Sequence, residues 1–168
     1  MVVIRCTQKL LRRAVPSRPV TASSDTRLGD WSGTLFGVGT QRFVLFASEH
    51  SRLPVLMPAR GLKDIGVQLC LRLGPVSSGL RVPAALADDE LAAMQDVLVA
   101  PTNSRSVLGS LNDFVHAARH RLQVEPSTDL LTMALWLGET PVGPINYESP
   151  NDVTRQLFGL PRLPRRAV

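Results

Sequence analysis

The sequence predicts an α+β fold: a mostly antiparallel or mixed sheet of about five strands, packed by about four to six helices in a single pair of layers. Three apolar runs follow one another closely between residues 34 and 59, which is typical of an antiparallel meander. Apolar residues recur at helical spacing in several later segments, most regularly in residues 101–122. A chain of 168 residues with 44% hydrophobic content is long enough for one core. We therefore expect one globular domain over residues 1–158 and a short basic C-terminal tail over residues 159–168, which we expect to fray.

The chain begins with a predicted strand, a tight turn and a short helix. Residues 2–6 form a β-branched run that is typical of a strand. Thr7 is placed to cap a helix that carries Leu10 and Leu11, and Pro16 would end that helix.

A long irregular segment is predicted next, because residues 16–29 are rich in Pro, Ser and Thr and have no periodicity. A loop of this length is typically either mobile or functional. It leads to Asp30 and Trp31 at the start of the next strand, and we expect the region around Trp31 to be exposed.

The meander consists of the runs "TLFGV", "RFVLFA" and "PVLMPA" within residues 34–59. Residues 37–40 supply a hairpin connection between the first two runs, and "SEHSRL" joins the second to the third. The segment "FVLFA" is apolar on successive residues, which predicts a central strand with both faces covered. Helices must therefore lie on the sheet.

Two helices are expected after the meander. Apolar residues at helical spacing predict the first over residues 62–73, although Gly66 weakens that prediction, and the Gly/Pro/Ser-rich residues 74–83 would end it. Asp88 or Asp89 would cap the second helix, with apolar residues on its inner side.

The run "VLVAP" predicts a further strand, and the strongest helix prediction of the chain follows it over residues 101–122. Its apolar residues fall within one stripe about 120° wide, which is the pattern of a helix that faces a core. These residues are Val107, Leu108, Leu111, Phe114, Val115, Ala118 and Leu122. The opposite face is polar and consists of Arg105, Ser106, Gly109, Ser110, Asn112, Asp113, His116, Arg119 and His120.

Two more helices complete the fold. Ser127 or Thr128 would begin the first and Gly138 would end it, while Ser149 is placed as the N-cap of the second and Gly159 as its end. The residues expected to face the core are Leu130, Leu131, Ala134, Leu135, Val153 and Leu157.

The charge balance is basic, with 19 Lys and Arg against 14 Asp and Glu, and only two of the basic residues are lysines. Arginine suits the bidentate recognition of phosphate or carboxylate groups. An arginine-rich, lysine-poor and alanine-rich chain is equally consistent with a coding bias, so both interpretations stay open.

The two cysteines, Cys6 and Cys70, are far apart in apolar sequence, which favours reduced thiols over a disulfide framework or a zinc site. Arg5 and Lys9 interrupt the first apolar run, and no window approaches about 18 uninterrupted apolar residues, so neither a signal peptide nor a membrane span is predicted. We expect a cytoplasmic protein.

The sequence contains no motif that identifies a reaction. It has no GxGxxG, phosphate-binding loop, nucleophile elbow or paired-Cys motif. Asp113, His116 and His120 share one helix face, but Ala117 stands where the metalloprotease pattern needs Glu. We therefore predict neither a metal site nor a cofactor.

The strongest candidate site lies at residues 103–113, where a predicted strand meets the long helix. Asn103 or Ser104 can cap this helix, and the free N–H groups of its first turn, together with Arg105, suit an anion. The short residues Ser106, Gly109 and Ser110 would let a ligand or another backbone approach closely. The alternative is that these residues are a helix cap, packing contacts and solvated charges.

Five segments together resemble a small, functionally uncharacterised prokaryotic domain family: "IRCTQKLL", "LGDW", "LPVLMPAR", "TNSRSVLGSLNDF" and "ETPVGPINYESPNDVTRQLF". The resemblance spans the chain from Val2 to about Phe158, and the family usually has Met in place of Leu111. It implies domain boundaries and no chemistry, and it gives no special weight to the two helix histidines. The polar site candidates in these segments are Arg5, Thr7, Gln8, Lys9, Asp30, Trp31, Asn103, Ser104, Arg105, Ser106, Ser110, Asn112, Asp113 and Asn146.

The two predicted strand-to-helix turns, "RCTQK" and "APTNSRS", would meet if their strands were neighbours. Arg5, Lys9 and Arg105 would then face one basic, hydroxyl-lined cleft. This hypothesis fails if the two turns lie at opposite ends of the sheet.

Three classes of function remain open. The first is a binding module for an anionic ligand such as a nucleotide, phosphate or nucleic-acid backbone, with salt-dependent association. The second is a small enzyme acting on a phosphate ester or nucleotide, with Arg105 stabilising charge and Asp113 as acid or base. The third is a protein-interaction component of a small bacterial operon, neutralising or toxin-like.

Overall fold

The computed structural model describes residues 1–13 and 17–164, and it has the expected α+β fold. Five strands form one mixed sheet in the order β4-β3-β2-β1-β5. The strands are β1 (Val2–Cys6), β2 (Trp31–Val38), β3 (Gln41–Ser48), β4 (Pro54–Pro58) and β5 (Val97–Pro101).

The sheet combines an antiparallel half and a parallel half. Strands β2, β3 and β4 form the expected meander, and Phe36 faces Phe43 across the first hairpin. The segment "FVLFA" within β3 is central and fully buried, as predicted. Strand β1 runs parallel to both β2 and β5, which places the carboxyl ends of β1 and β5 at the same edge.

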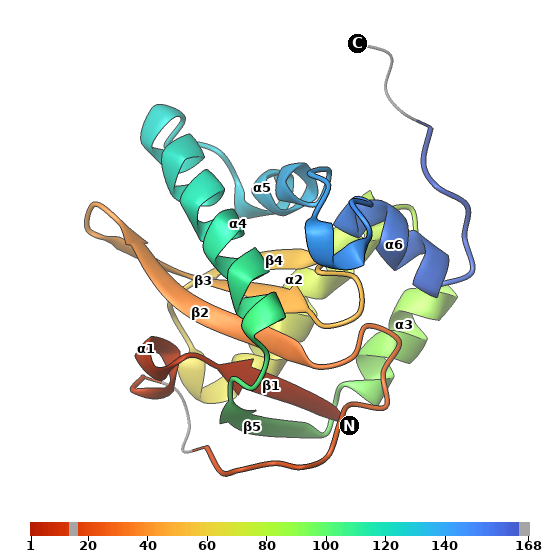
Figure 1. Cartoon of the computed structure of the whole chain (residues 1–168), viewed down its shortest axis with the longest axis horizontal. Coiled ribbons are helices and arrows are strands. Elements are labelled where there is room, and N and C mark those ends of the chain that lie inside the picture. Colours follow the sequence, from red (N-terminus) through yellow and green to blue (C-terminus); the bar gives the residue numbers. More distant parts are fainter. Residues whose placement is uncertain (14–16, 165–168) are drawn as a thin grey trace.

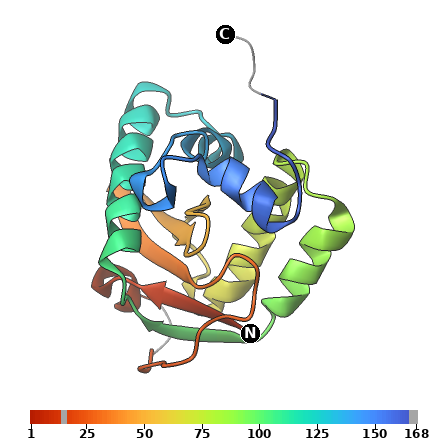
Figure 2. The same ribbon diagram turned by 45° about the vertical axis from the view of Figure 1, so that its right-hand side comes forward.

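Helices cover both faces of this sheet (Figure 1), so the fold has one more layer than the single pair expected. Helix α4 packs against β2 and β3 on one face, and α2 and α3 lie on the other (Figure 2). Helix α5 packs against the edge strand β4 and contacts both α2 and α4. The helices are α1 (Gln8–Leu11), α2 (Ile65–Gly79), α3 (Ala84–Ala93), α4 (Arg105–Val124), α5 (Leu130–Leu137) and α6 (Pro150–Leu157), with the short 3₁₀ turns η1 (Leu62–Asp64) and η2 (Gly143–Ile145).

Helix α2 ends inside the predicted Gly/Pro/Ser break, at Gly79, but it first runs through Pro75. Pro75 lacks the N–H that would bond to the carbonyl of Leu71, and both residues lie on the exposed side of the helix, where water can satisfy that carbonyl. Val76 and Ser77 are buried in the next turn, so tertiary packing outweighs the local breaker signal.

Gly66 is a packing requirement of α2. A Cβ at this position would overlap Val97 Cγ2, so the missing side chain lets the helix lie directly against β5. The residue that weakened the helix prediction is therefore needed where the helix meets the sheet.

Two helix starts were predicted wrongly. Helix α3 begins after Pro83, and Asp88 and Asp89 are exposed residues inside it, because the preceding alanines favour an earlier start. Helix α5 begins after Asp129, whose carboxylate accepts from the backbone N–H of Thr132 at 2.8 Å. Neither Ser127 nor Thr128 is its cap.

Two leucines expected in the core are partly exposed, Leu131 to 38% and Leu157 to 37%. In α6 the polar residues Thr154 and Arg155 face inward instead. Arg155 Nη1 donates to the carbonyl of Leu80 at 2.6 Å, at the end of α2. The side of α6 that faces the protein is therefore determined partly by buried carbonyl groups that need a hydrogen-bond donor. The spacing of apolar residues in the sequence does not reveal this requirement.

Among the helices of residues 1–13 and 17–164, none combines the length and the apolar composition that a membrane crossing needs.

Candidate functional site

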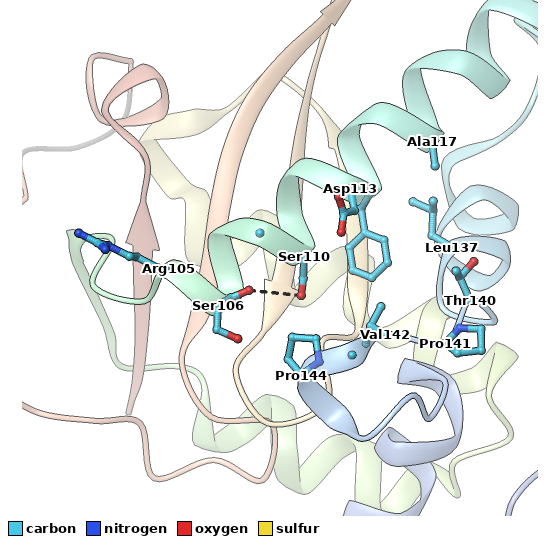
Figure 3. Close-up of a pocket in the computed structure, with 13 residues that line it drawn as sticks. Arg105, Ser106, Ser110, Asp113, Ala117, Leu137, Thr140, Pro141, Val142 and Pro144 are labelled. Carbon is cyan, nitrogen blue, oxygen red and sulfur yellow. Dashed lines mark hydrogen bonds between the residues drawn. The ribbon is translucent and has the colours of Figure 1, made fainter.

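A groove of about 400 Å³ lies between α4 and the segment that follows α5 (Figure 3). The α4 side carries polar groups at Ser106, Ser110 and Asp113. The facing side is largely apolar. The lining residues are Arg105, Ser106, Gly109, Ser110, Asp113, Phe114, Ala117, Leu137, Thr140, Pro141, Val142, Gly143 and Pro144.

The polar residues of the groove differ in how they face it. Ser110 was expected on the exposed face but is buried, and its hydroxyl donates to the carbonyl of Ser106 at 3.4 Å. The side chain of Arg105 extends away from the facing loop of Pro144 (Figure 3). Ser106 therefore presents the hydroxyl nearest the start of the helix.

The first turn of α4 begins as predicted. Ser104 is the N-cap, and its side chain accepts from the backbone N–H of Val107 at 3.3 Å. The N–H groups of Arg105 and Ser106 have no acceptor among the described residues. Such free N–H groups, together with the helix dipole, create a positive potential at this end of the helix.

Arg52 adds a charge to this region that sequence reasoning missed. It follows β3 in the loop before β4, has a left-handed backbone with φ 60°, and is only 7% exposed. Its Nη2 donates to Ser106 Oγ at 3.1 Å, and its Nη1 donates to the carbonyl of Glu49. No local pattern in "SEHSRL" marks this arginine as buried.

The guanidinium of Arg52 is poorly compensated. It forms no ion pair with any carboxylate within residues 1–13 and 17–164, and its buried Nε has no partner there. Burial lowers the pKa of Arg52, while the nearby Glu49 opposes that shift. A buried cation that is not ion-paired with a carboxylate is costly and favours an anion in contact with it.

The two strand-to-helix turns lie side by side, as the cleft hypothesis required. Cys6 is paired with Pro101, and the N–H of Thr102 donates to the carbonyl of Cys6 at 3.3 Å. Thr7 occupies the N-cap position of α1, but its hydroxyl contacts that of Thr34 at 3.1 Å instead of capping the helix. Lys9 is exposed on α1.

Arg5 and Asp30 lie outside the groove and form a buried ion pair of 2.7 Å. The second carboxylate oxygen of Asp30 accepts from the N–H and the hydroxyl of Ser24, both at 2.8 Å. Arg5 also donates to the carbonyl of Ala22 at 3.3 Å. The pair therefore fastens the irregular segment before β2 to the sheet.

The expectation that Trp31 is exposed is wrong, because its side chain is completely buried at the start of β2. Its pairing with Ser48 in β3 and with Ile4 in β1 places it in the interior of the sheet.

The remaining candidates are exposed. Asn103 precedes α4, Asn112 lies on its outer face, Gln8 begins α1, and Asn146 follows η2 with a left-handed backbone of φ 58°. His116 and His120 are also exposed on α4. In the part of the chain that the structure describes, no three His, Cys, Asp or Glu side chains gather as metal ligands would.

Comparison with known families confirms the resemblance to an uncharacterised family. The model of a family described as "Domain of unknown function (DUF6933)" matches residues 3–153. Neither the comparison with curated proteins nor that with solved structures gives a match. The match covers most of the chain, including the sheet, the turn before α4 and the groove, and the protein therefore belongs to the DUF6933 family of domains of unknown function.

Proposed function

We propose that this domain binds a small anionic ligand at the first turn of α4, with the rest of the ligand in the adjoining groove. The observation that carries the proposal is the buried guanidinium of Arg52, which has no carboxylate partner among the described residues and contacts Ser106. A protein retains such a charge at a cost, and an anion above Ser106 would offset that cost.

The anion would be held by three donors. Two are the backbone N–H groups of Arg105 and Ser106, which the helix leaves free. The third is the Ser106 hydroxyl: because its oxygen accepts from Arg52, its own proton is available to a ligand. Arg105 is exposed at the rim, where it attracts anions without closing the site.

The composition of the groove indicates what else the ligand carries. Phe114, Leu137 and Val142 form an apolar wall, and Asp113 is the only acidic residue that lines the groove. The best fit is a phosphate or carboxylate attached to a partly apolar body. Thr7 and Lys9 belong to the neighbouring turn and extend the basic, hydroxyl-rich surface there.

The test is calorimetric titration with inorganic phosphate at low salt, on the wild type, Arg52→Gly and Arg72→Ala. Glycine suits the left-handed backbone of Arg52, so this variant removes the guanidinium without adding strain. Arg72 is an exposed arginine on α2 and serves as the charge-matched control.

We expect phosphate to bind about 10-fold more weakly to Arg52→Gly, because the variant loses both the buried positive charge and the hydrogen bond that leaves the Ser106 proton free for the ligand. Arg72→Ala should match the wild type. Equal affinity of all three proteins, or no binding by the wild type at millimolar phosphate, would contradict the proposal. Thermal unfolding of each variant shows whether the fold is retained.

A further inference from the structure

The hairpin of β2 and β3 extends beyond its neighbours in the sheet. Strand β1 pairs with β2 only as far as Gly33, and β4 pairs with β3 only from Phe43 onward. Residues 37–42 therefore form a two-stranded ribbon without flanking strands. Figure 1 shows this tip projecting at one side of the molecule, beside the C-terminal part of α4.

Three arginines from different elements gather at this ribbon. Arg119 of α4 donates from Nε to the carbonyl of Gly37 at 3.2 Å. Arg42 lies on the same glycine, because its Nη1 occupies the space that a Cβ on Gly37 would need. Arg60, which follows β4, lines a surface hollow of about 420 Å³ together with Arg42. Glycine at position 37 thus leaves room for the Arg42 guanidinium against the ribbon.

The charge of this surface is not neutralised locally. Among the described residues, none that lines the hollow is acidic, its other members being Thr40, Gln41, Phe43, Pro58 and Ala59. Within the described chain, none of the three arginines forms an ion pair. All three are exposed, and the whole chain carries a net charge of +5. Clustered, uncompensated guanidinium groups suit repeated phosphate groups.

We propose that this ribbon tip binds the phosphate backbone of double-stranded nucleic acid, a function separate from ligand binding at α4. A two-stranded β-ribbon fits the major groove of a duplex, and flanking arginines then contact phosphates. Single strands are instead held by exposed aromatic rings on which bases stack. The only aromatic residue of the hollow, Phe43, is buried against Phe36, so the surface favours a duplex.

The experiment is fluorescence anisotropy with a labelled duplex of mixed sequence, repeated at several salt concentrations. The test variant is Arg42→Ala combined with Arg60→Ala, and the control combines Arg13→Ala with Arg72→Ala. Both double variants lose the same charge, and all four arginines are exposed. Thermal unfolding and phosphate titration at α4 accompany the measurement.

We expect the wild type to bind the duplex with an affinity that falls as salt rises. Losing two phosphate contacts should reduce the slope of log K against log salt by about 2 in the Arg42/Arg60 variant alone. An equal loss in both double variants would overturn the proposal, since net charge would then explain binding. Absence of duplex binding, or tighter binding of a single strand, would overturn it as well. Phosphate binding at α4 should be unchanged, which keeps the two proposals separately testable.

Discussion

Cys6 shows how burial alone can set the chemistry of a residue. Its thiol is 1% exposed at the end of β1, and burial raises its pKa to about 12. The thiolate is the reactive form, so Cys6 is protected both by its surroundings and by its protonation state. Cys70 is only partly buried, and burial raises its pKa as well.

This shift predicts a loss of stability at high pH. Because the folded pKa is raised above the unfolded value near 8.5, the unfolded chain releases its proton first. The contribution of the buried, protonated Cys6 thiol to the free energy of unfolding is fully present below about pH 8.5 and is lost as the pH rises toward 12. Compared with Cys6→Ala, the wild type should lose up to about 1.4 kcal/mol more of its unfolding free energy per pH unit between pH 9 and 11.

Urea unfolding of both proteins at pH 8, 9, 10 and 11 measures this difference. Alkylation of the native protein at pH 8 provides a second check, because Cys70 should react and Cys6 should not. Parallel stability curves for the two proteins would contradict the assigned shift.

Single residues also mark the limit of sequence-based prediction. Ser104, the cap of α4, was one of the two residues predicted for that position, because capping depends on neighbours along the chain. Arg5, Asp30 and Arg52 could not be placed in this way. Each is buried by segments distant in sequence: Arg5 pairs with Asp30, and Arg52 contacts Ser106 on α4. Some polar side chains in the candidate segments therefore hold parts of the fold together. Only their tertiary contacts distinguish them from side chains that could donate to a ligand.

At the level of elements, glycine contributes differently to two helices. Gly66 in α2 faces Val97 of β5 with no room for a Cβ, whereas Gly109 in α4 has nothing within 4 Å of that position. In helices alanine is favoured over glycine by up to about 1 kcal/mol unless the added methyl group meets another atom. The same substitution should therefore have opposite signs in the two helices.

We expect Gly66→Ala to destabilise the protein by about 1–3 kcal/mol through overpacking, and Gly109→Ala to stabilise it by about 0.5–1 kcal/mol. Chemical denaturation measures both changes. Adding Val97→Ala should recover part of the loss in Gly66→Ala, because it removes the methyl group that the new Cβ would meet. A stabilising Gly66→Ala would show that α2 can move away from β5 at little cost.

The elements that the sequence predicted best share strong periodicity. The apolar stripe of α4 and the closely spaced apolar runs of the meander come from residues close together in the chain, and both have the expected partners. Helix α2 continues past the first residues of its predicted break, to Gly79, because a proline on an exposed face costs less than one in a packed helix. The start of α3 was predicted wrongly because an exposed aspartate can lie inside a helix as well as at its N-cap position. At the ends of helices, tertiary packing thus outweighs local capping and helix-breaking residues.

At the scale of the whole molecule, the order of the strands decides where a site can form. Strand β1 lies between β2 and β5, far apart in sequence, so its turn meets the turn that begins α4. From the sequence we could say only that the two turns would meet if their strands were neighbours. The groove adds residues 137–144, which no motif linked to the helix. Local sequence patterns do not show which distant strands pair or which later loop lies beside α4. Both depend on how the whole core packs.

The C-terminal boundary of the folded core depends on contacts made by the residues that follow α6. Residue 158 was the expected end of the domain, yet Arg155 Nε donates to the carbonyl of Pro161 at 2.6 Å, and the N–H of Leu160 donates to the carbonyl of Arg155 at 2.9 Å. Leu160 also packs against the core. We propose that residues 159–162 belong to the folded unit and that the tail begins after them.

Two shortened chains test this boundary, one ending at residue 162 and the other at residue 158. Both lack the last residues, so their difference isolates the segment that contacts Arg155. The shorter chain leaves a buried guanidinium without one acceptor, which costs about 1–3 kcal/mol or more. Its Tm should therefore be lower by roughly 2–12 °C, since 1 kcal/mol shifts the Tm by about 2–4 °C in a domain of this size. Equal Tm values would return the boundary to residue 158, because Arg155 would then be satisfied by the carbonyls at the end of α2 alone.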